Sequence, residues 1–320
     1  MKLSYSSILP FSVFGFWKAY FVQMRPYLLY VSGIAGLSGM AMGTNAGTSL
    51  WKMLAFIPFF LGYGFGQALT DCFQTDTDKL SAPYRPLSRG VISISSVLIV
   101  SITGLCFSGL ILYFVSFDSF LLCVLSVIGL ASYSYVKKHF WVAGPFHNAW
   151  IVALLPMMGY FTVEHVKGFP SHFSSYIALT FFSYASFVLI GYLKDTGADK
   201  ATGYKTFPVV FGWDKTIIAG DLFAIVSLAL FWWHGDKNIY EIIAGGSASI
   251  ILLKGQLYGH FTKRKNEKAA LYPILSTVKS FILFHIAIVV HFQSQWWLVM
   301  LIYYVFFEIA LYRRPARYQV

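Results

Sequence analysis

The sequence predicts an all-α protein that crosses a membrane many times, as a bundle of nine core helices with an extra helix at the C-terminal end. Of its 320 residues, 57% are hydrophobic and 12% are charged, whereas about a quarter of the residues of a soluble domain are charged. The mean hydropathy is +0.64. Apolar stretches of about 20 residues, the length that crosses a bilayer as a helix, recur along the whole chain.

Ten apolar segments are candidates for these helices, and none shows the alternating pattern of a strand. The last two are divided only by the short polar stretch at 291–295. We expect a single transmembrane domain over 1–320, with a core at about 20–292 and an extra helix and basic tail at 293–320. The ten segments lie at 27–45, 52–70, 91–114, 117–136, 142–162, 174–193, 216–234, 239–258, 270–292 and 295–312.

The net charge of +11 would suggest a nucleic-acid partner in a soluble protein, but in a membrane protein it indicates the positive-inside pattern. Lys and Arg gather at the N-terminus and in the loops after even-numbered segments, and only Lys52, Lys167 and Lys237 lie clearly on the other side. These loops are therefore predicted to be cytoplasmic, and no nucleic-acid partner is expected. The start of the chain resembles neither a cleaved signal nor a transit peptide, which favours a bacterial inner membrane.

Two acidic clusters follow the second and the sixth segments, both on the predicted cytoplasmic side. The first holds Asp71, Asp76 and Asp78, and the second holds Asp195 and Asp199. Carboxylates at the edge of a bilayer are unfavourable unless something compensates them. A divalent cation does so, because hard cations prefer carboxylate oxygens. Two such clusters with Lys and Arg nearby are what a metal-bridged diphosphate requires.

These clusters resemble the two motifs of the UbiA superfamily of intramembrane prenyltransferases. The family's first motif reads Asn-Asp-x-x-Asp-x-x-x-Asp and precedes an Arg-Pro-Leu run, which corresponds here to 70–78 and 85–87. Its second motif, Asp-x-x-x-Asp with a Gly-x-x-Thr-x-Pro-Val tail, corresponds to 195–199 and 203–209. The Arg25-Pro26 pair also resembles the family, and the likeness extends to about 292.

The first motif departs from the family at two positions, because Thr70 replaces Asn and Gln74 replaces an Asp. If the second segment continues as a helix, Asp71, Gln74 and Asp78 share one face. Asp195 and Asp199, at i and i+4, would share another. We expect one Mg²⁺ at Asp195 and Asp199, and a second at Asp78 with Asp71 or the weaker carbonyl oxygen of Gln74.

The resemblance implies Mg²⁺-dependent transfer of an isoprenoid from its diphosphate to an aromatic or other lipophilic acceptor, with release of pyrophosphate. It places the catalytic residues at Asp78, Asp195, Asp199 and Tyr135, of which Tyr135 would reach the allylic oxygen. Asn148 is a candidate for orienting the acceptor, although a hydrogen bond between helices would equally explain it. The diphosphate would bind Arg25, Arg85, Lys194, Gln74 and Lys79.

The acceptor stays open, since an arene, a tetrapyrrole carboxylate, a quinone precursor and a lipid hydroxyl all fit the motifs. Two other functions also stay open. A membrane terpene cyclase would use the same scaffold and let the substrate's own double bonds capture the cation. A non-catalytic lipid-binding or carrier protein would explain the altered first motif.

Overall fold

The computed structural model describes residues 8–43, 50–164, 169–170, 172–233 and 235–314, and within these ranges every regular element is a helix. Residues 1–7 and the end of the predicted basic tail, 315–320, lie outside the described residues. Three short helices are α1 (Phe14–Gln23), α4 (Thr75–Ser81) and α9 (Thr196–Ala201), with 3-10 turns η1 (Tyr192–Asp195) and η2 (Ser294–Trp296). The long helices are α2 (Pro26–Met42), α3 (Leu50–Asp71), α5 (Ile94–Val115), α6 (Phe117–His139), α7 (Ala143–Val163), α8 (Phe173–Gly191), α10 (Phe207–Trp232), α11 (Ile239–Phe261), α12 (Leu271–Phe292) and α13 (Trp297–Tyr312).

Each of the ten predicted segments corresponds to one long helix. Within the described ranges, eight helical stretches are long and apolar enough to cross a membrane. Helix α2 is apolar but has 17 residues, and α11 has 23 residues without being among the eight. The predicted all-α membrane bundle is therefore confirmed, while its count of nine core helices is approximate.

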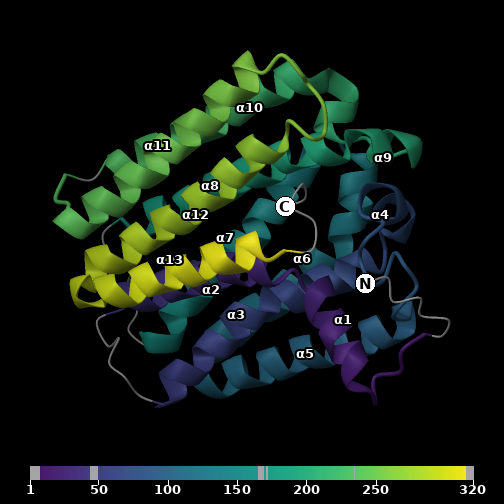
Figure 1. Ribbon diagram of the computed structural model, residues 1–320. Coiled ribbons are helices and arrows are strands. Elements are labelled where there is room, and N and C mark those ends of the chain that lie inside the picture. The colour runs from purple at the N-terminus through teal and green to yellow at the C-terminus, as the bar shows by residue number, and fades with distance from the viewer. Residues whose placement is uncertain (1–7, 44–49, 165–168, 171, 234, 315–320) are drawn as a thin grey trace.

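Helices α8 and α12 form the centre of the bundle, and most of their residues are buried. Helix α12 packs against α2, α8 and α11, and α7 packs against α2, α6 and α8. Helices α5, α6 and α13 have few buried residues, and Figure 1 shows α5 along one edge of the bundle. Their outward faces carry large apolar side chains, as contact with lipid requires.

Glycines bring α2 and α7 into close contact. A Cβ atom at Gly39 would overlap the carbonyl of Pro156, and one at Gly159 would overlap the carbonyl of Gly36. Small residues at such a crossing let two backbones approach within a membrane. This contact fixes α2, whose first residue follows Arg25, relative to the rest of the bundle.

The predicted extra helix, α13, packs on α2 and α12. Its Tyr303 hydroxyl donates a hydrogen bond of 2.7 Å to the Tyr30 carbonyl in α2. Lys279 in α12 forms an ion pair of 2.7 Å with Glu308 in α13. Charged groups within apolar helices are tolerated when they pair in this way.

Both acidic motifs interrupt their helices, which corrects the expectation of continuous helices. Helix α3 ends at Asp71, and Gln74, with φ −124° and ψ 24°, precedes α4. The second motif begins in η1 and continues in α9. Helices α4 and α9 pack against each other at one end of the bundle (Figure 1), where the hydroxyls of Thr77 and Thr202 are 2.8 Å apart.

Helix α10 begins at Phe207, earlier than the predicted segment at 216–234. Gly212, with φ 78° and ψ −177°, separates its first residues from the long apolar part. Positive φ is accessible to glycine without steric penalty. Apolar length alone therefore identifies only the part of α10 that follows this break.

Candidate active site

The two motifs meet around a polar cavity of about 740 Å³. Although more than 100 residues separate them in sequence, side chains from both motifs line it. Further basic residues come from the start of α2, from α6 and from the loop after α4. The charged and amide side chains that line the cavity include Arg25, Gln67, Asp71, Gln74, Asp78, Arg85, Lys137, Lys194 and Asp195.

Asp71 is engaged on both of its carboxylate oxygens. Oδ1 accepts hydrogen bonds from Arg25 Nη2 at 2.8 Å and Gln67 Nε2 at 2.9 Å. Oδ2 accepts one from Gln23 Nε2 at 2.6 Å, and Arg85 Nη1 lies 3.4 Å away. A buried carboxylate with this many donors is already compensated. We infer that Asp71 anchors two arginines, and its predicted role as a metal ligand stays a prediction.

Asp78 and Arg85 form the closest ion pair of the site. Arg85 Nη1 donates to Asp78 Oδ2 at 2.6 Å, and both residues are buried. Burial raises the pKa of the Asp78 carboxyl, against the opposing effect of Arg85. Asp78 lines the cavity with its carboxylate tied to the arginine, so the pair orients Arg85 toward any anion that enters.

Asp199, the last residue of the second motif, is completely buried. Its Oδ2 accepts a hydrogen bond of 3.1 Å from Thr206 Oγ1. Lys137 Nζ lies 3.3 Å from Oδ1, which nevertheless accepts no hydrogen bond of good geometry among the described residues. A buried carboxylate oxygen left in this state is suited to binding a cation.

Asp195 lies on the cavity side of the second motif. Its charge interacts with those of Lys194, Lys137 and Arg85. Asp195 and Asp199 offer the carboxylate oxygens that a hard divalent cation prefers, although only Asp195 lines the cavity. No group of three or more His, Cys, Asp and Glu side chains gathers among the described residues. A cation here would therefore need phosphate oxygens of a substrate to complete its shell, as Mg²⁺ sites with few carboxylates do.

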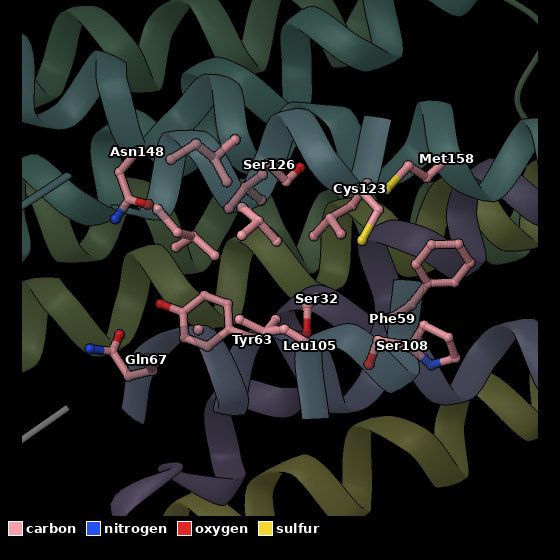
Figure 2. Close-up of a pocket in the computed structure, with 18 of the residues that line it drawn as sticks. Ser32, Phe59, Tyr63, Gln67, Leu105, Ser108, Cys123, Ser126, Asn148 and Met158 are labelled. Atoms are coloured by element: carbon pink, nitrogen blue, oxygen red, sulfur yellow. The ribbon is translucent and has the colours of Figure 1, made fainter. Parts of the chain in front are cut away.

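An apolar cavity of about 800 Å³ adjoins the polar one. Both are lined by Tyr63, Gln67, Tyr133, Asn148 and Tyr184, so these five residues mark the junction. Figure 2 shows Tyr63, Gln67 and Asn148 at one end of the apolar cavity, with Phe59 and Met158 at the other. The polar, charged cavity therefore continues directly into the apolar cavity inside the bundle.

Two pairs of tyrosines order the junction. The hydroxyls of Tyr63 and Tyr184 are 2.9 Å apart, and those of Tyr133 and Tyr192 are 3.0 Å apart. Each pair joins two helical elements and satisfies polar groups that would be unfavourable if left unpaired inside the bundle.

The structure brings most of the predicted site residues together, but Asp199, Tyr135 and Lys79 do not line the polar cavity. Arg25, Gln74, Asp78, Arg85, Lys194, Asp195 and Asn148 all line the polar cavity. Tyr135 is 63% exposed and contacts His139 and Phe140 instead, because it lies on the outer face of α6. Lys79 is also exposed, on the outer side of α4. Neither lines either cavity, which corrects the roles predicted for them.

Sequence reasoning missed Lys137 as a site residue and Tyr133 as the tyrosine that faces inward. The two lie four residues apart on α6, a spacing that places them on the same helix face. That spacing was the available signal, and it separates them from Tyr135. Gln67, one turn before Asp71 in α3, is detectable in the same way. Gln23 is not, because only the fold brings it to Asp71.

The sequence matches the description "UbiA prenyltransferase family" over residues 30–284. The chain belongs to this family. Its predicted membership is thereby confirmed, together with the expectation of a membrane-embedded prenyltransferase. Digeranylgeranylglyceryl phosphate synthase of Thermococcus kodakarensis is 28% identical over 214 residues, which cover 66% of this chain and 75% of that protein.

Solved UbiA homologues share the fold. The homologue from Archaeoglobus fulgidus bound to DMAPP and Mg²⁺ has a TM-score of 0.64 at 18% identity, covering 83% of this chain and 98% of that one. The homologue from Aeropyrum pernix has a TM-score of 0.66 at 14% identity, covering 86% and 98%. At these identities the likeness concerns the architecture of the bundle.

Proposed function

We propose that this protein transfers an isoprenoid chain from its diphosphate to a lipophilic acceptor and releases pyrophosphate, with Mg²⁺ as its cofactor. The observation that carries the proposal is the junction of the two cavities. One cavity is lined by basic and acidic groups from both motifs, and the other is apolar and long. A prenyl diphosphate has these same two parts. The A. fulgidus homologue bound to DMAPP and Mg²⁺ supports the cofactor and the donor class.

The basic residues bind and orient the diphosphate. Arg25 and Arg85 are held in place by Asp71 and Asp78, and Lys137 and Lys194 line the same cavity. Such preorganised cations stabilise the charge that develops on the departing pyrophosphate as the allylic carbon–oxygen bond breaks. Mg²⁺ at Asp195 and Asp199 would add Lewis-acid neutralisation of the same charge.

The apolar cavity receives the isoprenoid chain and keeps water from it. Its lining beyond the junction is mostly apolar, with the hydroxyls of Ser32, Thr70, Ser108 and Ser126 among the aliphatic and aromatic side chains, and an apolar chamber limits the access of water to an allylic cation formed at the mouth. The rings of Tyr63, Tyr133 and Tyr184 lie at that mouth. The acceptor would bond to the allylic carbon there and lose a proton. We propose that Asn148, which lines both cavities, orients the acceptor.

The acceptor class that we propose to test first is a glyceryl phosphate lipid with a free hydroxyl. Its support is the name of the similar proteins, digeranylgeranylglyceryl phosphate synthase. These named relatives are archaeal, so the bacterial inner membrane stays a prediction. We further propose that the site opens to the cytoplasm, since Lys and Arg gather on the side of both motifs.

The test uses purified protein in lipid nanodiscs with Mg²⁺ and prenyl diphosphates of graded length. Each donor is incubated with a geranylgeranylglyceryl phosphate, with a phenolic acceptor, or alone, and the products are identified by mass. Prenylated acceptor with stoichiometric pyrophosphate supports transfer. A cyclic hydrocarbon or alcohol formed without an acceptor would instead show a terpene cyclase. Donor binding without pyrophosphate release would show a non-catalytic lipid-binding protein.

A further inference from the structure

Three of the four carboxylate oxygens of Asp71 and Asp78 are already engaged by other side chains. Both oxygens of Asp71 accept hydrogen bonds from arginine and glutamine side chains. Asp78 Oδ2 is paired with Arg85 at 2.6 Å. A cation bound at these carboxylates would have to displace buried guanidinium groups, which would leave those groups without partners in a poorly solvated site.

Gln74 stands where the motif would otherwise offer another carboxylate, and it is also engaged. Its amide nitrogen donates to Ser134 Oγ at 2.9 Å. This contact orients the carbonyl oxygen toward Lys137 Nζ, which donates to it at 3.4 Å. A neutral amide oxygen is a weaker ligand for Mg²⁺ than a carboxylate. It is a suitable acceptor for an ammonium group.

The Lys137 ammonium occupies the place between the two motifs. It lies 3.4 Å from Gln74 of the first motif and 3.3 Å from Asp199 of the second. It also lies over the rings of Tyr192 and Tyr204, at 5.4 and 5.1 Å from their centroids. The side chain is 94% buried by these neighbours, so its positive charge is fixed in position rather than mobile in solvent.

We propose that this site takes one divalent cation per prenyl diphosphate, at Asp195 and Asp199, and that the Lys137 ammonium provides the positive charge at the first motif. The proposal rests on the proposed function, because it assigns the charges that meet the diphosphate. It differs from the sequence-based expectation of two Mg²⁺ ions. A lysine is a compact point charge that binds phosphate oxygens without the coordination shell of a metal.

The experiment counts metal ions directly, without turnover. The protein in nanodiscs is saturated with a non-reactive prenyl thiodiphosphate, and bound Mn²⁺ is measured by equilibrium titration and electron paramagnetic resonance. The wild type is expected to bind one Mn²⁺ per chain. The double variant Gln74→Asp with Lys137→Met supplies a carboxylate and removes the ammonium, and it is expected to bind two, with the line broadening of a coupled pair.

Lys138→Met is the matched control, because Lys138 neighbours Lys137 but is partly exposed and pairs with Asp76. This variant should bind one Mn²⁺, as the wild type does, and thermal unfolding verifies that each variant is folded. Two Mn²⁺ in the wild type would overturn the inference and leave the proposed function standing. One Mn²⁺ in the double variant would overturn the assignment to Gln74 and Lys137. Failure of the folded wild type to bind the thiodiphosphate would overturn the proposed function itself.

Discussion

Nη2 of Arg25 lies 2.8 Å from Oδ1 and 3.0 Å from Oδ2 of Asp71. The contact joins the start of α2 to the end of α3, although 46 positions separate the two residues. Arg25 adopts φ 55°, a left-handed conformation that is uncommon for a residue other than glycine. The ion pair compensates that strain and fixes the guanidinium at the edge of the polar cavity.

The substitution Asp71→Asn is therefore expected to destabilise the protein around the site and not to remove a metal ligand. Removing one partner of a buried ion pair destabilises by about 3–5 kcal/mol, so the unfolding temperature and donor binding should both fall, and excess Mg²⁺ should restore neither. Asp76→Asn is the control within the same motif, because Asp76 is exposed. An unchanged unfolding temperature with weakened Mg²⁺ dependence would show instead that Asp71 is a metal ligand.

The side chain of Tyr133 lines both cavities, whereas that of Tyr135 lies on the outer face of α6, and this difference is testable. Tyr133→Phe removes the hydroxyl that lies 3.0 Å from Tyr192, and loss of such a hydrogen bond amounts to about 1 kcal/mol. We expect kcat/KM for the prenyl diphosphate to fall about fivefold. Tyr135→Phe should leave it near the wild-type value, since Tyr135 lies outside both cavities. Equal losses in the two variants would contradict this geometry.

The length of the isoprenoid should depend on the apolar cavity. Gly62 lines it, and a Cβ atom there would meet nothing within 4 Å, so Gly62→Leu should fill part of the chamber. The variant is expected to discriminate against long donors while still using short ones. Competition between donors of two lengths measures this preference. Leu121→Phe on the exposed face of α6 is the control, and the same shift in both variants would speak against a tail site here.

The close contact of α2 with α7 predicts that alanine is tolerated less well at Gly39 than at Gly246. Gly39→Ala would push a methyl group into the Pro156 carbonyl, and overpacking of this kind destabilises by about 1–3 kcal/mol. Gly246→Ala in α11 meets open space and should be neutral or stabilising by about 1 kcal/mol through helix propensity. Thermal unfolding of both variants in one detergent compares them. Tolerance of Gly39→Ala would show that the helices are further apart.

Apolar length and charge placement were enough to predict the long helices and the position of both motifs at the same end of the bundle. The ends of the helices at the motifs were not predictable in this way. Asp71 and Asp78 have the spacing of one continuous face, but the break before Gln74 turns Asp78 toward Arg85 instead. Helix α4 packs against α9, which is distant in sequence, so the local pattern holds no sign of this contact.

The motifs predicted which residues gather, but not what each one binds. Asp71 and Asp195 are both acidic residues at the ends of apolar segments. One is surrounded by donors from α1, α2 and α3, and the other faces the cavity. The partners of Asp71 come from elements that only the fold brings together. The role of Lys137 was unpredictable for the same reason. Its local sequence fits a lysine at the membrane surface as well as a lysine buried in the site.

The most direct test of the account compares acceptor-dependent pyrophosphate release by the wild type and by Asp195→Asn. Asp195 lines the cavity, and the substitution removes its charge with little change in shape. The wild type should release pyrophosphate only with both Mg²⁺ and acceptor, and the folded variant should be slower by about 100-fold or more, as when charge stabilisation of a transition state is lost. Full turnover by a folded Asp195→Asn protein would contradict the assignment of this site.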